Sequence, residues 1–135
     1  MCKLSILSRN KGKKLLFLLN LFTQNNLFFT YTNRNYCAIE NGGEFYFIST
    51  RSHLYLDGAI AHSTKLAKSY GLDLINFNVE DYIIDVGTIN GDLLYYCRNF
   101  NYIGFEPSQT EYKLLVLNLL KIYGFMIKHV VNHKA

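Results

Sequence analysis

Two glycines that directly follow a short apolar run limit the folds open to this chain. The run DYIIDV, residues 81–86, is bounded by polar residues and leads straight into Gly87, and Gly91 follows four positions later. Such a run predicts a buried parallel strand. A glycine between a strand and a helix permits a tight turn and lets the backbone approach a ligand closely. We therefore predict a strand, a glycine bend and then a helix over residues 92–98.

The residues after this bend alternate between strand and helix patterns. Residues 102–105 form a second short strand, and Ser108 and Glu111 then match the S-x-x-E capping box that begins a helix. We predict the helix over residues 109–123 and a third strand over residues 125–131. Strand, helix, strand, helix, strand is typical of a parallel sheet with right-handed crossovers, so the predicted fold class is α/β.

The residues before the bend predict three further elements. Residues 44–56, EFYFISTRSHLYL, are rich in aromatic and β-branched side chains around a polar centre, and they predict a β-hairpin. Residues 59–70 place apolar side chains at roughly helical spacing, and Gly71 supplies a stop signal for that helix. Residues 13–22 contain a dense cluster of leucine and phenylalanine, which predicts a helix near the N-terminus.

Charge divides the chain into a basic leader and a slightly acidic remainder. The first acidic residue is Glu40, and the six basic residues before it give residues 1–39 a charge of +6. The eight other basic residues and the ten acidic residues leave residues 40–135 at −2. We interpret residues 1–39 as a basic N-terminal appendage, and residues 40–135 as the domain that contains the glycine bend.

A basic leader without acidic residues suits several kinds of partner. We favour a solvated basic helix that docks through its leucine and phenylalanine residues, and a weak contact with a membrane surface stays open. No basic stripe continues into the domain, so no nucleic-acid partner is expected. Asparagine, glutamine and threonine interrupt the charge-free run of residues 15–33, so no transmembrane span is expected. The cysteines Cys2, Cys37 and Cys97 lack C-x-x-C spacing and indicate reduced thiols in a cytoplasmic protein.

Two carboxylates at the ends of the first two parallel strands indicate an adenosine ligand. Glu106 lies 21 residues after Asp85, and in a doubly wound sheet a carboxylate there can accept hydrogen bonds from both hydroxyls of a ribose. The G-x-x-x-G spacing does not match the G-x-G-x-x-G of dinucleotide sites, and the P-loop lysine is missing. Asp85 would repel a pyrophosphate but suits the ammonium group of a methionine moiety.

The combined motifs resemble class I S-adenosylmethionine-dependent methyltransferases, and within that class they are most similar to the FkbM family. The matching segments are D-V-G-x-x-x-G-D-L, then I-G-F-E-P-S, then a helix with E-Y-K-L-L-x-L-N, over about residues 80–131. Thr88 stands where the family usually has Ala, and Ile89 where it usually has Asn, with Asn90 one place late. The resemblance implies a Rossmann-like methyltransferase sheet, S-adenosylmethionine as cofactor and methyl transfer to a carbohydrate or natural-product hydroxyl. The cofactor-binding residues that it implies are Asp85, Val86, Gly87, Thr88, Asn90, Gly91, Glu106 and Pro107.

The sequence supplies three of the seven strands of a class I methyltransferase sheet. We therefore expect residues 40–135 to be the N-terminal half of a Rossmann-like methyltransferase domain, with the acceptor pocket and general base missing and no catalytic residue assigned. No metal site is expected, because Val130 and Val131, between His129 and His133, indicate a strand and its frayed end rather than a helix. Two hypotheses stay open: an incomplete methyltransferase, and a noncatalytic fragment acting as a protein-interaction or membrane-surface module. An uncovered sheet edge also predicts self-association.

Overall fold

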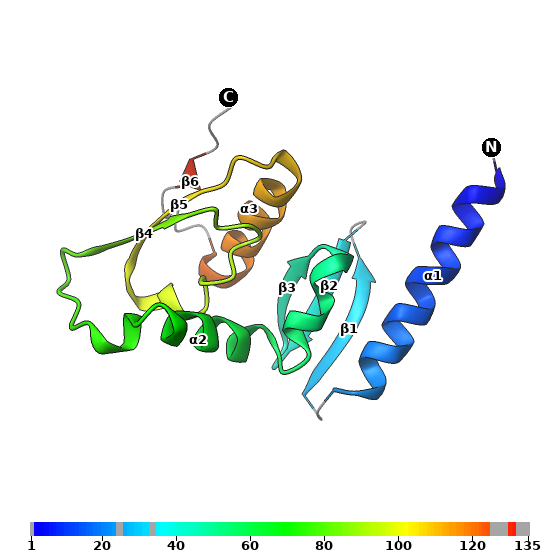
Figure 1. Cartoon of the computed structure of the whole chain (residues 1–135), viewed down its shortest axis with the longest axis horizontal. Coiled ribbons are helices and arrows are strands. Elements are labelled where there is room, and N and C mark those ends of the chain that lie inside the picture. Colours follow the sequence, from blue (N-terminus) through cyan, green and yellow to red (C-terminus); the bar gives the residue numbers. More distant parts are fainter. Residues whose placement is uncertain (1, 24–25, 33–34, 125–129, 132–135) are drawn as a thin grey trace.

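The computed structural model describes residues 2–23, 26–32, 35–124 and 130–131, and these residues form a mixed α/β fold. Figure 1 shows helix α1 at one end of the molecule, an antiparallel sheet beside it, and a parallel sheet toward the other end. Among the described residues, none of the helices combines the length and the apolar character needed to cross a membrane.

The antiparallel sheet consists of β1 (Leu27–Thr32), β2 (Asn35–Glu40) and β3 (Gly43–Phe47), paired in chain order. Asn41 and Gly42 connect β2 to β3, and both have positive φ, 51° and 80°. Asn-Gly is the pair that a two-residue hairpin turn with two positive φ values prefers. The hairpin of this chain is therefore β2–β3.

The hairpin predicted over residues 44–56 is wrong. The first half of that segment forms β3, but the second half forms a 3-10 helix, η1 (Ser49–Tyr55). Arg51 and Tyr55 both bond the carboxylate of Asp92, which lies just after the glycine bend. We infer that these contacts, formed with a residue far along the chain, outweigh the strand propensity of the segment.

Helix α1 (Cys2–Leu21) confirms the helix predicted over residues 13–22. Its residue Leu19 is buried in one cluster with Phe29 of β1. The Asn20 side chain donates to the Phe29 carbonyl oxygen at 2.9 Å and accepts from the Phe29 amide at 2.6 Å. These two bonds fix the end of α1 against the backbone of the edge strand β1.

One buried cluster joins α1, the antiparallel sheet and helix α2 (Ala59–Ser69). Phe29 of the sheet lies in it together with Tyr55 and Ala59. The helix predicted here is confirmed, and it is followed by Gly71 in the left-handed conformation, at φ 70°. The cluster includes residues from the basic appendage, residues 1–39, and from the predicted domain, residues 40–135. The division of the chain into these two parts stays a prediction.

The parallel sheet consists of β4 (Tyr82–Val86), β5 (Asn101–Phe105) and β6 (Val130–Val131), in that order. The first two predicted strands are confirmed, and their parallel pairing is confirmed with them. The third predicted strand is described only at its last two residues, because residues 125–129 lie outside the described part of the chain.

Helix α3 (Gln109–Tyr123) packs against both sheets. Ser108 caps it by accepting a hydrogen bond from the Glu111 amide, as the capping box predicts. Leu114 is buried with residues of β2 and β3, whereas the neighbouring Leu115 is buried with residues of β4 and β5. This helix therefore fixes the parallel sheet relative to the antiparallel one.

The helix predicted over residues 92–98 is wrong. That segment forms consecutive turns that end in a short 3-10 helix, η3 (Tyr96–Asn99). The carboxylate of Asp92 is held by two residues of η1, and the Tyr96 amide donates to Ser63 Oγ of α2 at 3.0 Å. We infer that these side-chain contacts replace the regular bonding of an α-helix in so short a segment.

Strand β4 is covered on one face. Ile83 is buried in a cluster with Leu115 of α3, whereas Tyr82, Ile84 and Val86 on the other face are exposed. The prediction of a buried strand is therefore wrong for one of its faces. Among the described residues, the helices that contact this sheet pack on the face of Ile83. Self-association through the sheet edge stays a prediction.

Candidate functional site

The predicted glycine bend follows β4 and is hydrogen-bonded to the end of β5. The amides of Gly87 and Thr88 both donate to the Phe105 carbonyl oxygen, at 2.8 and 3.2 Å. The Gly91 amide donates to the Thr88 carbonyl oxygen at 2.8 Å, which closes the turn. Gly87, Ile89 and Gly91 have positive φ values of 78°, 56° and 89°. The bend is thus a compact loop at the carboxyl edge of the parallel sheet.

The glycines around the bend have different roles. A Cβ atom at Gly87 would meet no heavy atom within 4 Å, so the space beside this backbone is open. A Cβ atom at Gly91 would lie 2.4 Å from Leu94 Cδ1, so this position requires glycine for packing. Gly104 of β5 makes room for Thr88, whose Cγ2 would lie 2.9 Å from an added Cβ. Of these three glycines, Gly87 is the one with room for a ligand beside it.

Glu106 is buried, with 3% of its surface exposed, and it holds the bend. Its Oε2 atom accepts from the Ile89 amide at 2.7 Å, and its Oε1 atom accepts from the Ser108 amide at 2.6 Å. A carboxylate has about four acceptor positions, and these two bonds use two of them. The residue predicted to bind a ribose therefore also connects the bend to the start of α3.

Asp85 lies on the adjacent strand and is half-buried. The Tyr102 hydroxyl donates to Asp85 Oδ2 at 2.7 Å. Burial raises the pKa of Asp85, the bond from Tyr102 opposes this, and the charges of Asp92 and Glu106 raise that pKa further. The two predicted carboxylates, Asp85 and Glu106, are thus close enough to influence each other at the same edge of the sheet.

The other predicted site residues differ in their exposure. Thr88 and Asn90 are buried, and within the described residues their side-chain atoms Oγ1 and Oδ1 have no hydrogen-bond partner. Buried acceptors of this kind are where a ligand or a water is expected. Pro107 is exposed beside Glu106. Val86 is 79% exposed on the open face of β4, so its side chain is not brought together with the others.

A buried polar network beside the bend was not predicted from the sequence. The Asp92 carboxylate pairs with Arg51 and accepts from the Tyr55 hydroxyl at 2.5 Å. Asn90 Nδ2 donates to the Tyr55 oxygen at 2.9 Å, and His62 Nε2 lies 3.5 Å from Asp92. Burial raises the pKa of Tyr55, and the Asp92 charge adds to this effect. The network connects the bend to η1 and α2.

Asn118 connects the same bend to the antiparallel sheet. It is the last residue of the E-Y-K-L-L-x-L-N motif, but the sequence predicted no role for it. Its Nδ2 donates to the Asn90 carbonyl oxygen at 2.7 Å and to the Tyr46 carbonyl oxygen at 2.8 Å. Its Oδ1 accepts from the Tyr46 amide at 2.7 Å. A fully buried amide with these three bonds fixes α3, β3 and the bend in one arrangement.

Metal ligands and thiols do not add to this site. Among the described residues, no group of three histidine, cysteine or carboxylate side chains is placed to hold a metal ion. His129 and His133 lie outside those residues. Cys37 and Cys97 are buried, and burial with the charge of Glu44 raises the pKa of Cys37 to about 11, so that thiol stays protonated at neutral pH.

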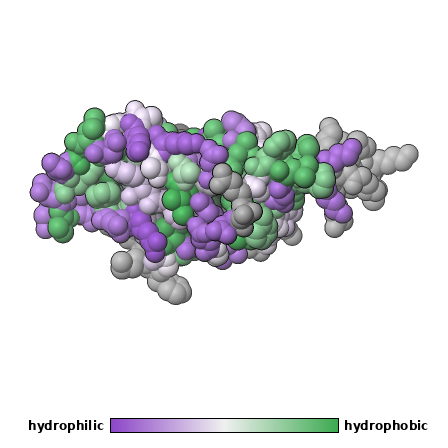
Figure 2. Space-filling model, turned by 90° about the horizontal axis from the view of Figure 1, so that it is seen from below, coloured by the Kyte–Doolittle hydropathy of each residue, from purple (hydrophilic) through white to green (hydrophobic). Residues whose placement is uncertain are grey.

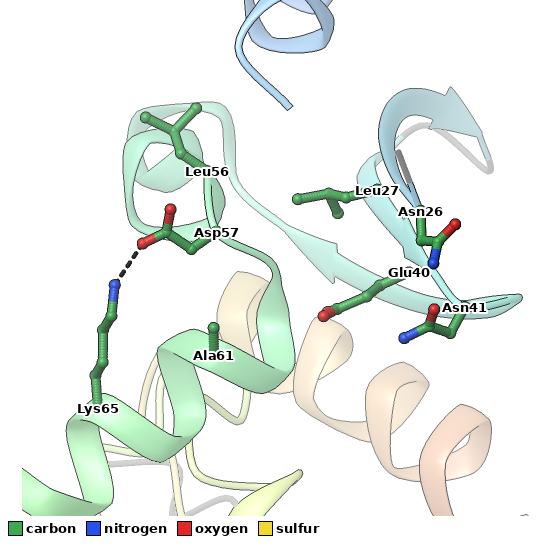
Figure 3. A pocket seen from close by; sticks show the side chains of 8 residues that line it. All are labelled: Asn26, Leu27, Glu40, Asn41, Leu56, Asp57, Ala61 and Lys65. Atoms are coloured by element: carbon green, nitrogen blue, oxygen red, sulfur yellow. Dashed lines mark hydrogen bonds and ion pairs between the residues drawn. The ribbon is translucent and has the colours of Figure 1, made fainter. Parts of the chain in front are cut away.

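A cavity of about 710 Å³ lies away from the bend, between the antiparallel sheet and α2 (Figure 3). Glu40 reaches its wall, and Glu40 Oε2 accepts from the Ile60 amide at the start of α2, at 3.1 Å. Lys65 and Asp57, also in the wall, form an ion pair with each other. These ionic groups stabilise the helix start and the neighbouring turn, and the cavity contains none of the predicted site residues.

Comparison of this chain with known protein families, with curated proteins and with solved structures finds no match. The case for a function therefore depends on the motifs and on the geometry of the bend.

Proposed function

We propose that the glycine bend binds the adenosyl and methionine parts of S-adenosylmethionine, and that the chain is the cofactor half of an FkbM-like methyltransferase. One observation supports this more than any other. Asp85 and Glu106 lie at the carboxyl ends of adjacent parallel strands, and the open backbone of Gly87 lies beside them. Ligands of open α/β sheets bind at this edge.

The described side chains fit the chemistry of that cofactor. Glu106 can accept from the ribose hydroxyls with the acceptor positions that its two backbone bonds leave available. Asp85, half-buried, suits the ammonium group, because an ion pair away from bulk water is strengthened. The unpartnered oxygens of Thr88 and Asn90 add two acceptors in the bend. When bound, the cofactor supplies an electrophilic methyl group attached to a sulfonium.

The acceptor and the cellular setting come from the sequence alone. The resemblance favours a carbohydrate or natural-product hydroxyl as acceptor, and the cysteine pattern favours the cytoplasm. We assign no general base among the described residues. The alternative is a noncatalytic fragment with the same bend. Such a fragment would bind the cofactor without transferring a methyl group, or would not bind it.

We expect isothermal titration calorimetry of the full chain with S-adenosylhomocysteine to show binding at one site. Asp85→Asn and Glu106→Gln should each weaken that binding about 10- to 100-fold, because each loses a charge-assisted hydrogen bond. Glu80→Gln is the matched control, since Glu80 is exposed and its substitution removes one carboxylate charge near the same strand. The proposal is rejected if the native chain gives no heat, or if the Glu80 variant loses as much affinity.

A further inference from the structure

The outward face of α1 carries lysine and large apolar side chains next to one another. We define this basic apolar face by Lys13, Lys14, Phe17, Leu18 and Leu21, all of which are exposed. Phe17 is 66% exposed, and the first four residues line one shallow hollow of about 340 Å³. Figure 2 shows hydrophobic surface gathered toward the end of the molecule where α1 lies.

The fold keeps this face turned away from the core. The opposite side of α1 packs against the antiparallel sheet through Leu15, Leu16 and Leu19. Asn20 adds its two bonds to the backbone of Phe29. Because these contacts occupy the other side of the helix, the basic apolar face cannot pack against the core of this chain without releasing α1 from β1, and it stays open to a partner.

The charge of the leader indicates the kind of partner. Residues 1–39 carry six basic residues and no acidic one, while the remainder of the chain is slightly negative. An anionic surface is therefore attracted to this end of the molecule. Exposed phenylalanine and leucine gain free energy when they leave water for acyl chains, and lysine stems can extend so that their ammonium groups stay at the headgroups. Phosphate recognition alone would not use the apolar half of this face.

We propose that the basic apolar face of α1 docks the protein on an anionic lipid bilayer, with the helix lying in the plane of the headgroups. A helix with lysine beside phenylalanine and leucine binds such an interface through apolar burial and electrostatic attraction together. This interaction is separate from the glycine bend, so it holds whether or not the bend binds a cofactor.

The test is sedimentation of the full chain with vesicles of phosphatidylcholine, with and without 30% phosphatidylserine, a fraction of about one lipid in three. We expect binding to the vesicles that contain phosphatidylserine and at least about tenfold weaker binding to pure phosphatidylcholine. Lys13→Gln with Lys14→Gln should weaken binding about 25-fold, because each basic residue near the surface contributes about fivefold. Lys68→Gln with Lys113→Gln removes the same charge from exposed positions on α2 and α3 and should change binding less than about twofold.

A second pair of variants separates a lipid partner from a nucleic-acid partner. Phe17→Ser with Leu18→Ser keeps the charge, alters two exposed side chains and should weaken vesicle binding at least about tenfold. Failure of the native chain to bind the anionic vesicles would overturn the proposal. The proposal would also be overturned if the Lys68 and Lys113 control weakened vesicle binding as much as the Lys13 and Lys14 variant. It would likewise be overturned if the native chain bound a single-stranded RNA more tightly than the vesicles and Phe17→Ser with Leu18→Ser left that RNA binding unchanged.

Discussion

Replacing Asp92 with alanine is expected to lower the free energy of unfolding by about 3–5 kcal/mol, as measured by urea denaturation. Asp92 is 6% exposed and accepts from Arg51, Tyr55 and Asn90. Removing the carboxylate leaves the partly buried Arg51 guanidinium and the buried Tyr55 hydroxyl without this acceptor, while Asn90 keeps its bond to the Tyr55 oxygen. Removing one partner of a buried pair is strongly destabilising, because the other partner stays buried without compensation. Domains are stable by only about 5–15 kcal/mol, so this loss is a large fraction of the total.

Asp57→Ala is the matched control for this prediction. It also removes a carboxylate from an ion pair, but Asp57 and its partner Lys65 are both mostly exposed. Exposed pairs contribute about 0–1 kcal/mol, so this variant should unfold almost as the native chain does. Equal unfolding midpoints for the Asp92 and Asp57 variants would contradict the structural role of the network.

Replacing Gly91 with alanine is expected to cost about 3 kcal/mol of unfolding free energy. The residue has a φ of 89°, which an L side chain rarely adopts, and its added Cβ would lie 2.4 Å from Leu94 Cδ1 and 2.9 Å from Leu115 Cδ1. Both leucines are fully buried, so neither can move away without disturbing the core.

Gly87→Ala separates the two causes of that cost. Gly87 also has a positive φ, 78°, but its added Cβ would meet nothing within 4 Å. We therefore expect about 1–2 kcal/mol from the backbone alone, measured in the same denaturation experiment. A Gly87 variant less stable than the Gly91 variant would show that the packing of the bend is not as described.

The elements that were predicted correctly have their signals close together in the sequence. The capping box at Ser108 and Glu111 fixes the start of α3 within four residues. Gly71 ends the α2 segment, and the run before Gly87 forms β4. The Asn41-Gly42 turn is also a local signal, and it marks the β2–β3 hairpin. The hairpin was instead predicted over residues 44–56, because that segment has a strand-like composition.

The elements that were missed depend on contacts between distant residues. Arg51 and Asp92 are 41 positions apart. Asp92 belongs to the D-V-G-x-x-x-G-D-L motif, but no local pattern marks Arg51 as its partner. We infer that their contact favours η1 over a strand after β3, and that it helps to hold the residues after the bend in turns. Propensity within a short window cannot include such a partner, so both segments were given the structure that their composition favours.

The candidate site was predictable in its position and less so in its detail. Parallel strands place their carboxyl ends at one edge, so the proximity of Asp85 and Glu106 followed from the order of the strands. The sequence gives no indication that Glu106 already accepts from Ile89 and Ser108. Nor does it show that Asn118 holds the bend from α3, because that depends on how the helix packs.

The most direct test of the central claim is to follow backbone amide resonances of the full chain while S-adenosylhomocysteine is added. If the bend is the binding site, the largest shifts should occur at the amides of Gly87, Ile89 and Ser108, which surround Glu106. Shifts concentrated instead at Asn41 and Ala61, which line the separate cavity, or no shifts at all, would contradict the account.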